Sequence, residues 1–231
     1  MQTIRLKTVS TIDAVCEMLE QDIYSLYFPP GSKITENNLT SRYGVSRNTV
    51  REAITFLLAN GLLMKVANKG IFVREISLDD IKEIFYLREL LEAEAIKIVT
   101  ASEASPAELV RQAEKVKAID PNDNWDANIK ADLKFHQLLV QATGSSRLIR
   151  LYNSLFAEVK LCIYQSKNLS PARPENAIHH LEILAAMEKG DLKSALEMLS
   201  HHMEESVKSY TSNYLARSNS QKNQEKGDEK A

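Results

Sequence analysis

The chain has 231 residues, enough for one large domain or two modest ones, and it is 44% hydrophobic and 26% charged, as ordinary globular proteins are. No apolar run approaches the roughly 18 residues of a membrane span, residues 1–7 lack the apolar core of a signal peptide, and the two cysteines, Cys16 and Cys162, do not suggest a disulfide framework. These features argue against a membrane-spanning or secreted class, and we expect a cytoplasmic protein.

The formal net charge of −2 is unevenly spread along the chain. Residues 1–74 hold nine Lys and Arg against six Asp and Glu, whereas residues 75–231 hold twenty against twenty-five. Only the first part therefore has the sign that attraction to phosphate needs, and its excess is modest.

The first 60 residues predict three short helices, each opened by a hydroxyl side chain that can accept a backbone N–H. The helices span residues 10–26, 35–43 and 47–60, and their caps are Ser10, Thr35 and Ser46. Pro29-Pro30-Gly31 stops the first helix, and Gly44 and Gly61 follow the second and third, at the position where glycine commonly ends a helix.

The third helix combines an apolar face with a polar N-terminal end. Val50, Ile54, Leu57 and Leu58 have core spacing. The polar residues near its start are Ser46, Arg47, Asn48, Thr49 and Arg51. They suit the major groove of DNA, because arginine can bind guanine edges or phosphates and Ser, Asn and Thr can bond to bases or backbone. The alternative is a solvated helix with two surface arginines.

Two short β-rich runs, residues 62–66 and 71–74, flank a glycine-containing loop and predict a hairpin. Next to the third helix, such a hairpin is a wing whose tip, with Lys69 and Gly70, would approach the minor groove or the DNA backbone. The alternative is a plain structural turn.

Several motifs in this part, in the right order, resemble the winged helix-turn-helix of the GntR family of bacterial transcription regulators, over about residues 22–74. They are the Pro-Gly turn of residues 28–34, Val45-Ser46-Arg47, Val50-Arg51-Glu52-Ala53, Asn60-Gly61-Leu62 and Lys69-Gly70. Asn37 stands where some relatives have an arginine that reaches DNA, so Arg47 and Arg51 would carry more of the contact.

From residue 77 the pattern is helical almost throughout. The predicted helices are 77–100, 106–118, 126–143, 146–168, 175–189 and 191–215, and residues 216–231 are polar without an apolar stripe, which predicts a disordered tail. We therefore expect a mainly α protein with a winged helix-turn-helix domain at 1–76, an all-α helical bundle at 77–215 and a tail at 216–231.

All five histidines lie in the second domain, and helical spacing separates them. His136, His180 and His202 fall on the apolar stripes of three different helices, with Asp132 one turn before His136. His179 and His201 fall on polar faces of two of these helices. Burying these groups without partners is costly, and a divalent ion such as zinc or nickel would resolve the cost. The alternative is three core histidines that bond to the backbone or to Asp132.

Arg88 also lies on an apolar stripe, in the helix at 77–100, with Glu92 one turn later. An Arg88–Glu92 pair is one interpretation. The other is that the Arg88 guanidinium binds the carboxylate of a small effector through two hydrogen bonds.

A second resemblance covers about residues 77–212 and concerns the FCD domain of the FadR-type GntR regulators. It depends on Asp132-Leu133-Lys134-Phe135-His136, on His180 with Ile183-Leu184 and Gly190-Asp191 after it, and on His202. In metal-binding members an aspartate and three histidines hold the ion, and they correspond to Asp132, His136, His180 and His202. Their effectors are often small organic acids, which an arginine in the helix of Arg88 can bind. Gly144-Ser145-Ser146 departs from the Gly-Asn-Pro of many members.

The leading hypothesis is a homodimeric, ligand-responsive DNA-binding regulator that reads a near-palindromic operator and senses an organic acid at a metal site. A metal-dependent enzyme is the first alternative, although no inward Glu, Ser or Cys is evident as a base or nucleophile. A regulator with a purely structural metal is the second.

Overall fold

The computed structural model describes residues 10–102, 106–166 and 175–228, and within these ranges it describes the side chains of all residues except 175 and 217–228. The chain divides into two compact units, an N-terminal unit of residues 1–76 and a C-terminal unit of residues 77–231. The boundary expected after residue 76 falls at this division.

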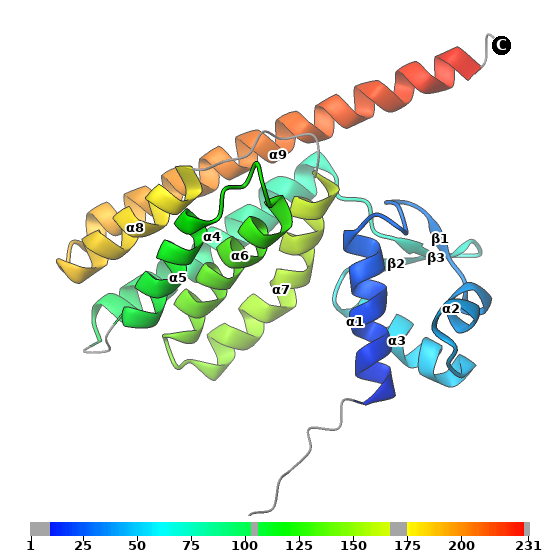
Figure 1. The fold of residues 1–231 in the computed structure, drawn as a ribbon, viewed down its shortest axis with the longest axis horizontal. Coiled ribbons are helices and arrows are strands. Elements are labelled where there is room, and N and C mark those ends of the chain that lie inside the picture. Colours follow the sequence, from blue (N-terminus) through cyan, green and yellow to red (C-terminus); the bar gives the residue numbers. More distant parts are fainter. Residues whose placement is uncertain (1–9, 103–105, 167–174, 229–231) are drawn as a thin grey trace, which may run out of the picture. The chain divides into compact units, whose positions relative to one another are not determined.

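The N-terminal unit contains three helices and a small sheet (Figure 1). Its elements are α1 (Thr11–Tyr24), β1 (Lys33–Ile34), α2 (Glu36–Tyr43), α3 (Arg47–Ala59), β2 (Leu63–Val66) and β3 (Gly70–Val73). The predicted winged helix-turn-helix is therefore confirmed. The sheet has the antiparallel order β1-β3-β2, so the expected hairpin of β2 and β3 gains a third strand of only two residues.

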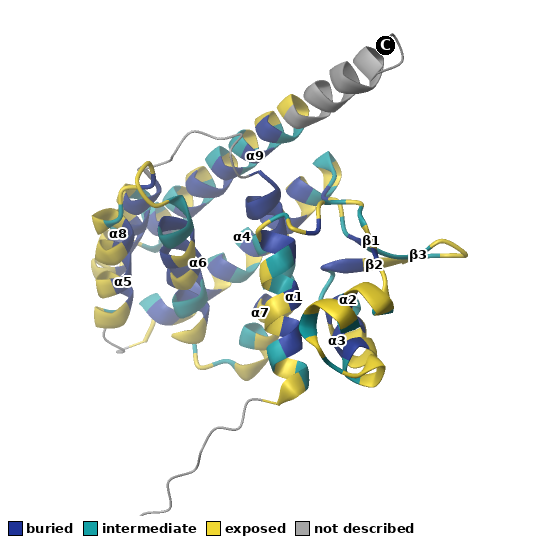
Figure 2. Cartoon of the chain, turned by 45° about the vertical axis from the view of Figure 1, so that its right-hand side comes forward, coloured by how far each residue is buried: buried dark blue, intermediate teal, exposed yellow. Residues whose placement is uncertain are grey.

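Capping and apolar spacing explain why these helices form where they do. The side chains of Ser10, Thr35 and Ser46 each accept the N–H of the residue three positions later, which fixes the start of α1, α2 and α3. Gly44 ends α2 with φ of 66°, a left-handed conformation that residues with a Cβ rarely adopt. The helices of the unit are buried along one side (Figure 2), Leu19 of α1 and Leu57 of α3 are fully buried, and α1 packs against α3.

A polar contact ties α1 to the end of α2. Arg42 donates from Nε and Nη2 to the two carboxylate oxygens of Asp22, at 2.5 and 2.7 Å, and the Tyr43 hydroxyl donates to Asp22 Oδ2 at 2.6 Å. The Arg42 guanidinium also stacks over the Tyr27 ring at 3.6 Å. Burial by itself would raise the pKa of Asp22, but the hydrogen bonds from Arg42 and Tyr43 outweigh it and lower the pKa below its usual 3.8.

The C-terminal unit is all helical and is arranged around α4 (Leu78–Thr100), which packs against α6, α7, α8 and α9. Ser77 and Asp80 form a reciprocal capping box that starts α4. The other helices are α5 (Ala107–Ala118), α6 (Trp125–Gln141), α7 (Ser146–Gln165), α8 (Glu175–Glu188) and α9 (Leu192–Asp228).

Most of these bounds agree with the predicted ranges to within a few residues, and the differences occur at the ends. Helix α7 stops at Gln165, and residues 167–168 of its predicted range lie outside the described residues. Helix α9 continues to Asp228, beyond the predicted end at residue 215 and through most of the segment expected to be disordered. Residues 221–226 are Gln, Lys, Asn, Gln, Glu and Lys, several of which propagate a helix without needing a core face.

Within the described part of the chain, no helix combines the length and the apolar composition that crossing a bilayer requires.

Replacing Asp22 by Asn removes the charged acceptor that joins α1 to α2, and we expect faster deuterium exchange of α1 and α2 amides in the full-length protein. A hydrogen bond to a charged group contributes about 1.5–3 kcal/mol, and the partial exposure of Arg42 reduces this toward about 1 kcal/mol, so exchange should rise about fivefold. Because the folded pKa of Asp22 is lowered, the stabilisation is present above pH 3.8 and is lost as the pH falls through the lowered value.

The ratio of variant to wild-type exchange rates should therefore shrink between about pH 6 and about pH 3. The control is Asp79→Asn, which changes an exposed carboxylate of α4 and should leave α1 and α2 unaffected. A ratio that stays constant over this pH range would contradict the assignment of the effect to the Asp22 charge.

Candidate functional site

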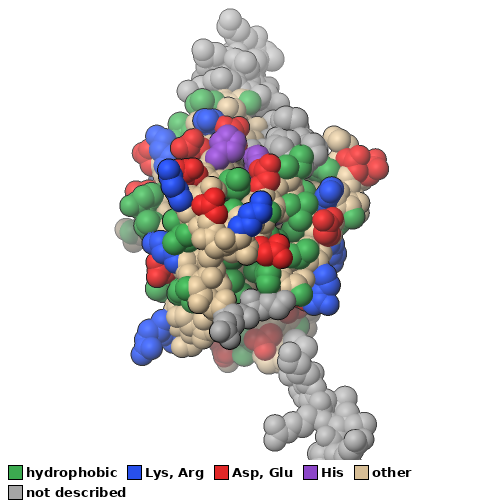
Figure 3. Space-filling model, turned by 90° about the vertical axis from the view of Figure 1, so that its left-hand side faces the viewer, with side chains coloured by type: hydrophobic (Ala, Val, Ile, Leu, Met, Phe, Trp, Pro, Cys, Tyr) green, Lys and Arg blue, Asp and Glu red, His purple; other side chains and the backbone are tan. Residues whose placement is uncertain are grey.

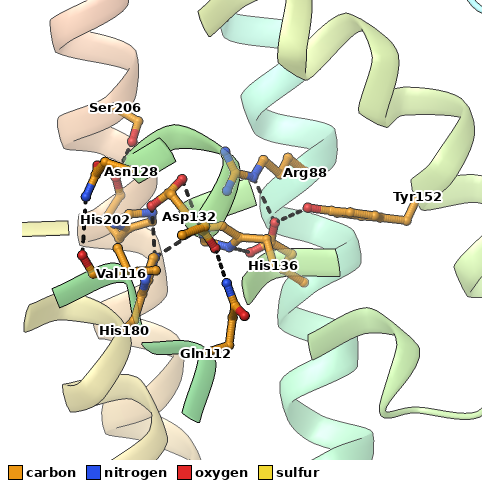
Figure 4. A network of polar contacts seen from close by, with 12 residues as sticks. Arg88, Gln112, Val116, Asn128, Asp132, His136, Tyr152, His180, His202 and Ser206 are labelled. Carbon is orange, nitrogen blue, oxygen red and sulfur yellow. Dashed lines mark hydrogen bonds and ion pairs between the residues drawn. The ribbon is translucent and has the colours of Figure 1, made fainter. Parts of the chain in front are cut away.

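Four polar side chains from three helices meet inside the C-terminal unit (Figure 4). Helix α6 supplies Asp132 and His136, one turn apart, while α8 supplies His180 and α9 supplies His202. Each of the four is buried, and one ligand atom from each lies within 4.8 Å of all the others. The structure thus brings together the four residues predicted as metal ligands, which we call the inner cluster.

The spacing of the donor atoms suits ligands that share one ion. His136 Nε2 and His180 Nε2 are 3.0 Å apart, and His180 Nε2 is 3.4 Å from Asp132 Oδ1. Metal–nitrogen bonds are about 2.0–2.1 Å long, so neighbouring ligand atoms around one ion lie about 2.9–3.4 Å apart. His202 completes the group, with its ring centroid 5.0 Å from that of His180 and 5.2 Å from that of His136.

The protonation states of the cluster also fit a cation. Burial lowers the pKa of His180 well below its usual range, with further contributions from the nearby His136 ring and the Arg88 charge, and burial chiefly does the same for His202. Neutral imidazoles keep the lone pair that a metal requires. Asp132 Oδ1 is buried without a hydrogen-bond partner among the described residues, and an unpaired buried carboxylate oxygen is costly. One hydrogen bond between His136 and His180 would leave that oxygen unpaired, so the residues fit a divalent ion better than a satisfied core.

A second layer of contacts orients His136 (Figure 4). Its Nδ1 lies 2.7 Å from Glu92 Oε2, and Glu92 Oε1 accepts hydrogen bonds from Arg88 Nε and from the Tyr152 hydroxyl, each at 2.8 Å. A carboxylate acceptor assigns the proton to Nδ1, so His136 Nε2 presents its lone pair to the inner cluster. Burial alone would raise the pKa of Glu92, but interactions with His136 and Arg88 outweigh it and lower the pKa to about 2.

Arg88 is buried, unlike an arginine that lines an open effector-binding site. It is 2% exposed and forms the ion pair with Glu92 that the sequence offered as the simpler interpretation. One terminal nitrogen, Nη2, is buried and has no hydrogen-bond partner within the part of the chain that the structure describes. Arg88 therefore retains one donor for a further acceptor.

Two residues of this layer were missed or underrated by the sequence analysis. The sequence offered Glu92 only as a partner of Arg88, whereas the structure shows that its carboxylate is fully buried and contacts His136. Its position one turn after an inward arginine was the available signal. Tyr152 of α7 gave no signal, since a tyrosine on an apolar stripe does not reveal its partner.

The residues predicted to contact DNA lie at the surface of the N-terminal unit. Ser46 caps α3, and the side chains at its start are exposed or half-buried: Arg47, Asn48, Thr49 and Arg51. Arg51 Nε donates to Glu36 Oε1 of α2 at 2.8 Å, and both side chains are exposed.

The hairpin tip has the predicted exposed Lys69, and Gly70 adopts φ of 116°. A Cβ on Gly70 would lie 3.1 Å from Cε of the exposed Lys33, whose flexible side chain can move away, so it is the backbone conformation that favours glycine.

A winged helix-turn-helix followed by an all-helical domain is the architecture of a class of two-domain DNA-binding regulators. Residues 11–73 match the family described as bacterial regulatory proteins, gntR family, and residues 83–205 match the FCD domain. The chain belongs to the GntR family of transcriptional regulators and carries an FCD domain, which is consistent with the FadR subfamily.

Known proteins of this kind resemble the chain over most of its length. It is 28% identical to the uncharacterized HTH-type transcriptional regulator BphR of Paraburkholderia xenovorans, over 86% of this chain and 84% of that protein. It is also 28% identical to the HTH-type transcriptional repressor RspR of Escherichia coli, over 83% and 85% of the two chains. The crystal structure of a protein from Rhodococcus sp. RHA1, described as a GntR transcriptional regulator, shares the fold with a TM-score of 0.74 at 24% identity. The match covers 87% of this chain and 98% of that one. These relatives are transcriptional regulators and not enzymes.

Replacing Asp132 by Asn tests whether the inner cluster holds an ion. We expect zinc to raise the melting temperature of the wild type but to have much less effect on the variant, because loss of a ligand weakens binding at least about 100-fold, or about 2.7 kcal/mol. In a chelator the variant should be no less stable than the wild type, since it lacks a buried unpaired charge.

Thermal unfolding of full-length protein in zinc and in EDTA measures both effects. Asp126→Asn, in the first turn of the same helix, is the matched control and should respond to zinc as the wild type does. An equal zinc response in Asp132→Asn would show that the carboxylate is not a ligand.

Proposed function

We propose that this GntR-type transcriptional regulator works in the cytoplasm as a homodimer that senses a small organic acid at a divalent metal in its C-terminal unit. The single observation that carries the proposal is the meeting of Asp132, His136, His180 and His202 at one buried point. Zinc or nickel suits three imidazoles and one carboxylate.

The inner cluster would hold the ion, which when bound would supply Lewis-acid coordination for a carboxylate ligand. The chain itself adds a second anchor, because Arg88 Nη2 is a buried donor that lacks a partner among the described side chains. A charge-assisted hydrogen bond from guanidinium to carboxylate is strong. This unused donor favours a sensing site over a purely structural metal.

Ligand binding would act on a network that joins three helices. Arg88 and Glu92 belong to α4, His136 to α6 and Tyr152 to α7, and their contacts meet at the Glu92 carboxylate. An acid that accepts a hydrogen bond from Arg88 Nη2 would add a second anion beside the Arg88–Glu92 pair, and so would bias the packing of α4 against α6 and α7. A ligand that binds one packing better than another shifts the population between them.

On the DNA side, the start of α3 would enter the major groove with Ser46, Arg47, Asn48, Thr49 and Arg51. The wing would place Lys69 and Gly70 against the minor groove or the backbone. Two copies would read a near-palindromic operator. In support of a homodimer, Tyr86, Leu87 and Leu90 of α4 are 62%, 46% and 49% exposed, and clustered exposed apolar side chains mark interaction surfaces.

A metal-dependent enzyme is the weaker candidate. Glu92 is the buried carboxylate nearest to the inner cluster outside it, and its three hydrogen bonds and its pKa of about 2 make it a poor general base.

Replacing Arg47 by Ala should weaken binding to an operator that the wild type selects from random duplexes. Loss of a base or phosphate contact costs about 1–3 kcal/mol, which is about 5- to 150-fold in affinity. Gel-shift titration measures it, with Arg111→Ala, an exposed arginine of α5, as control. Wild-type affinity of both Arg47→Ala and Arg51→Ala would remove α3 as the reading helix.

A panel of dicarboxylates and hydroxycarboxylates should contain acids that raise the melting temperature of the zinc-loaded wild type, because a ligand that binds only the folded state stabilises it by about 2.7 kcal/mol at 100 times its Kd. Arg88→Lys keeps the charge but loses the planar fork, so it should keep the zinc response and lose the acid response. A response to zinc with none to any acid in the wild type would indicate a structural metal.

A further inference from the structure

A second group of metal-binding side chains lies on the surface of the C-terminal unit, between α8 and α9. His179 and His201, the histidines that the sequence placed on polar faces, line a pocket of about 250 Å³. We call it the outer pocket, and its remaining lining residues are Glu182, Ser194, Glu197 and Met198. Figure 3 shows histidine side chains at the surface of this side of the molecule, with acidic side chains close by.

The spacing of these residues places two donors on each helix. Glu197 and His201 are one turn apart on α9 and are both exposed, and His179 and Glu182 are three residues apart on α8. Residues at these separations share one helix face. The rings of His179 on α8 and His201 on α9 lie edge to face, with centroids 5.3 Å apart and planes at 68°.

Two imidazoles and two carboxylates make a ligand set suited to zinc, nickel and similar ions. Among the described residues, the inner cluster alone has three or more donors already converged, so the outer donors surround their pocket without closing on one point. The exposed Glu197 and His201 can turn into it. The pair of Glu197 with Lys193, at 3.8 Å between exposed side chains, is too weak to prevent this.

The outer pocket adjoins the inner cluster. The His179 ring lies 5.7 Å from the His202 ring, edge to face, and His179 and His201 directly precede the ligands His180 and His202 in sequence. A line of imidazoles therefore runs from exposed His201, through half-buried His179, to buried His202.

We propose that the outer pocket is a second divalent transition-metal site, which captures an ion from solvent and supplies it to the inner cluster. Capture depends only on the outer residues, whereas supply rests on the proposed function of the inner cluster. The four ligands of the inner cluster are all buried, so an ion needs a route to them from the solvent. The line of imidazoles offers a nitrogen ligand at each step along that route.

The test of capture is a calorimetric titration of metal-free, full-length protein with Ni²⁺. We expect the wild type to bind two ions per chain. The double variant Glu197→Ala, His201→Ala should bind the second ion more than about tenfold more weakly, because loss of even a residue that only hydrogen-bonds a metal ligand can weaken binding this much. Glu204→Ala removes an exposed acid of α9 outside the pocket and should retain both ions.

Unchanged stoichiometry and affinities in the double variant would overturn the outer site. If the wild type binds one ion and the double variant binds none, the outer site stands and the inner metal centre fails, so the two ideas are separable.

The test of supply is the rate at which Ni²⁺ enters the inner cluster, followed by stopped-flow competition with a chromogenic chelator. Local capture of a cation raises association rates by about 10- to 1000-fold, so the double variant should load at least about tenfold more slowly and reach the same final occupancy of the inner cluster. Equal loading rates in the wild type and the double variant would overturn the supply role.

Discussion

A buried carboxylate among neutral imidazoles is the constraint on which the C-terminal unit depends. Asp132 is 4% exposed, and its Oδ1 has no hydrogen-bond partner among the described residues, while the pKa values of His180 and His202 are held well below their usual range by burial. A carboxylate in such surroundings gains little from its neighbours unless a cation is present. Since the four donors come from α6, α8 and α9, an ion among them would also hold these helices together.

Glu92 extends this constraint to the helix at the centre of the unit. Helix α4 packs against four of its neighbours, and Glu92 is the point where it contacts a ligand of the inner cluster. The same carboxylate accepts from Arg88 and from Tyr152 of α7. Because each of these groups is buried, none can exchange its partner for water, so a change at one contact must be compensated at the others. This coupling makes the site suitable for transmitting the presence of a ligand into helix packing.

The sequence predicted those features that depend on local chemistry. Hydroxyl caps and glycine stops located α1, α2 and α3, and the apolar stripes separated His180 and His202 from their neighbours His179 and His201, which the structure places at the pocket on the surface. The contact of His136 with Glu92 could not be predicted, because it depends on how α4 lies against α6, 44 residues away in sequence. Strand β1 was missed because two residues carry no period, and its pairing partner β3 lies far along the chain.

In the proposed complex with DNA, the two arginines of α3 would have different roles, although they lie one turn apart. Arg51 shares its charge with Glu36, and the hydrogen bond between them lowers the pKa of Glu36, so this carboxylate stays ionised beside the arginine. Its negative charge offsets the attraction of Arg51 to phosphate at long range, and it also holds the guanidinium in one direction. Arg47 and Lys69 would then supply most of the steering, which depends on net charge. Arg51 is better suited to short-range contact with base edges, where a fixed fork geometry matters more than unbalanced charge.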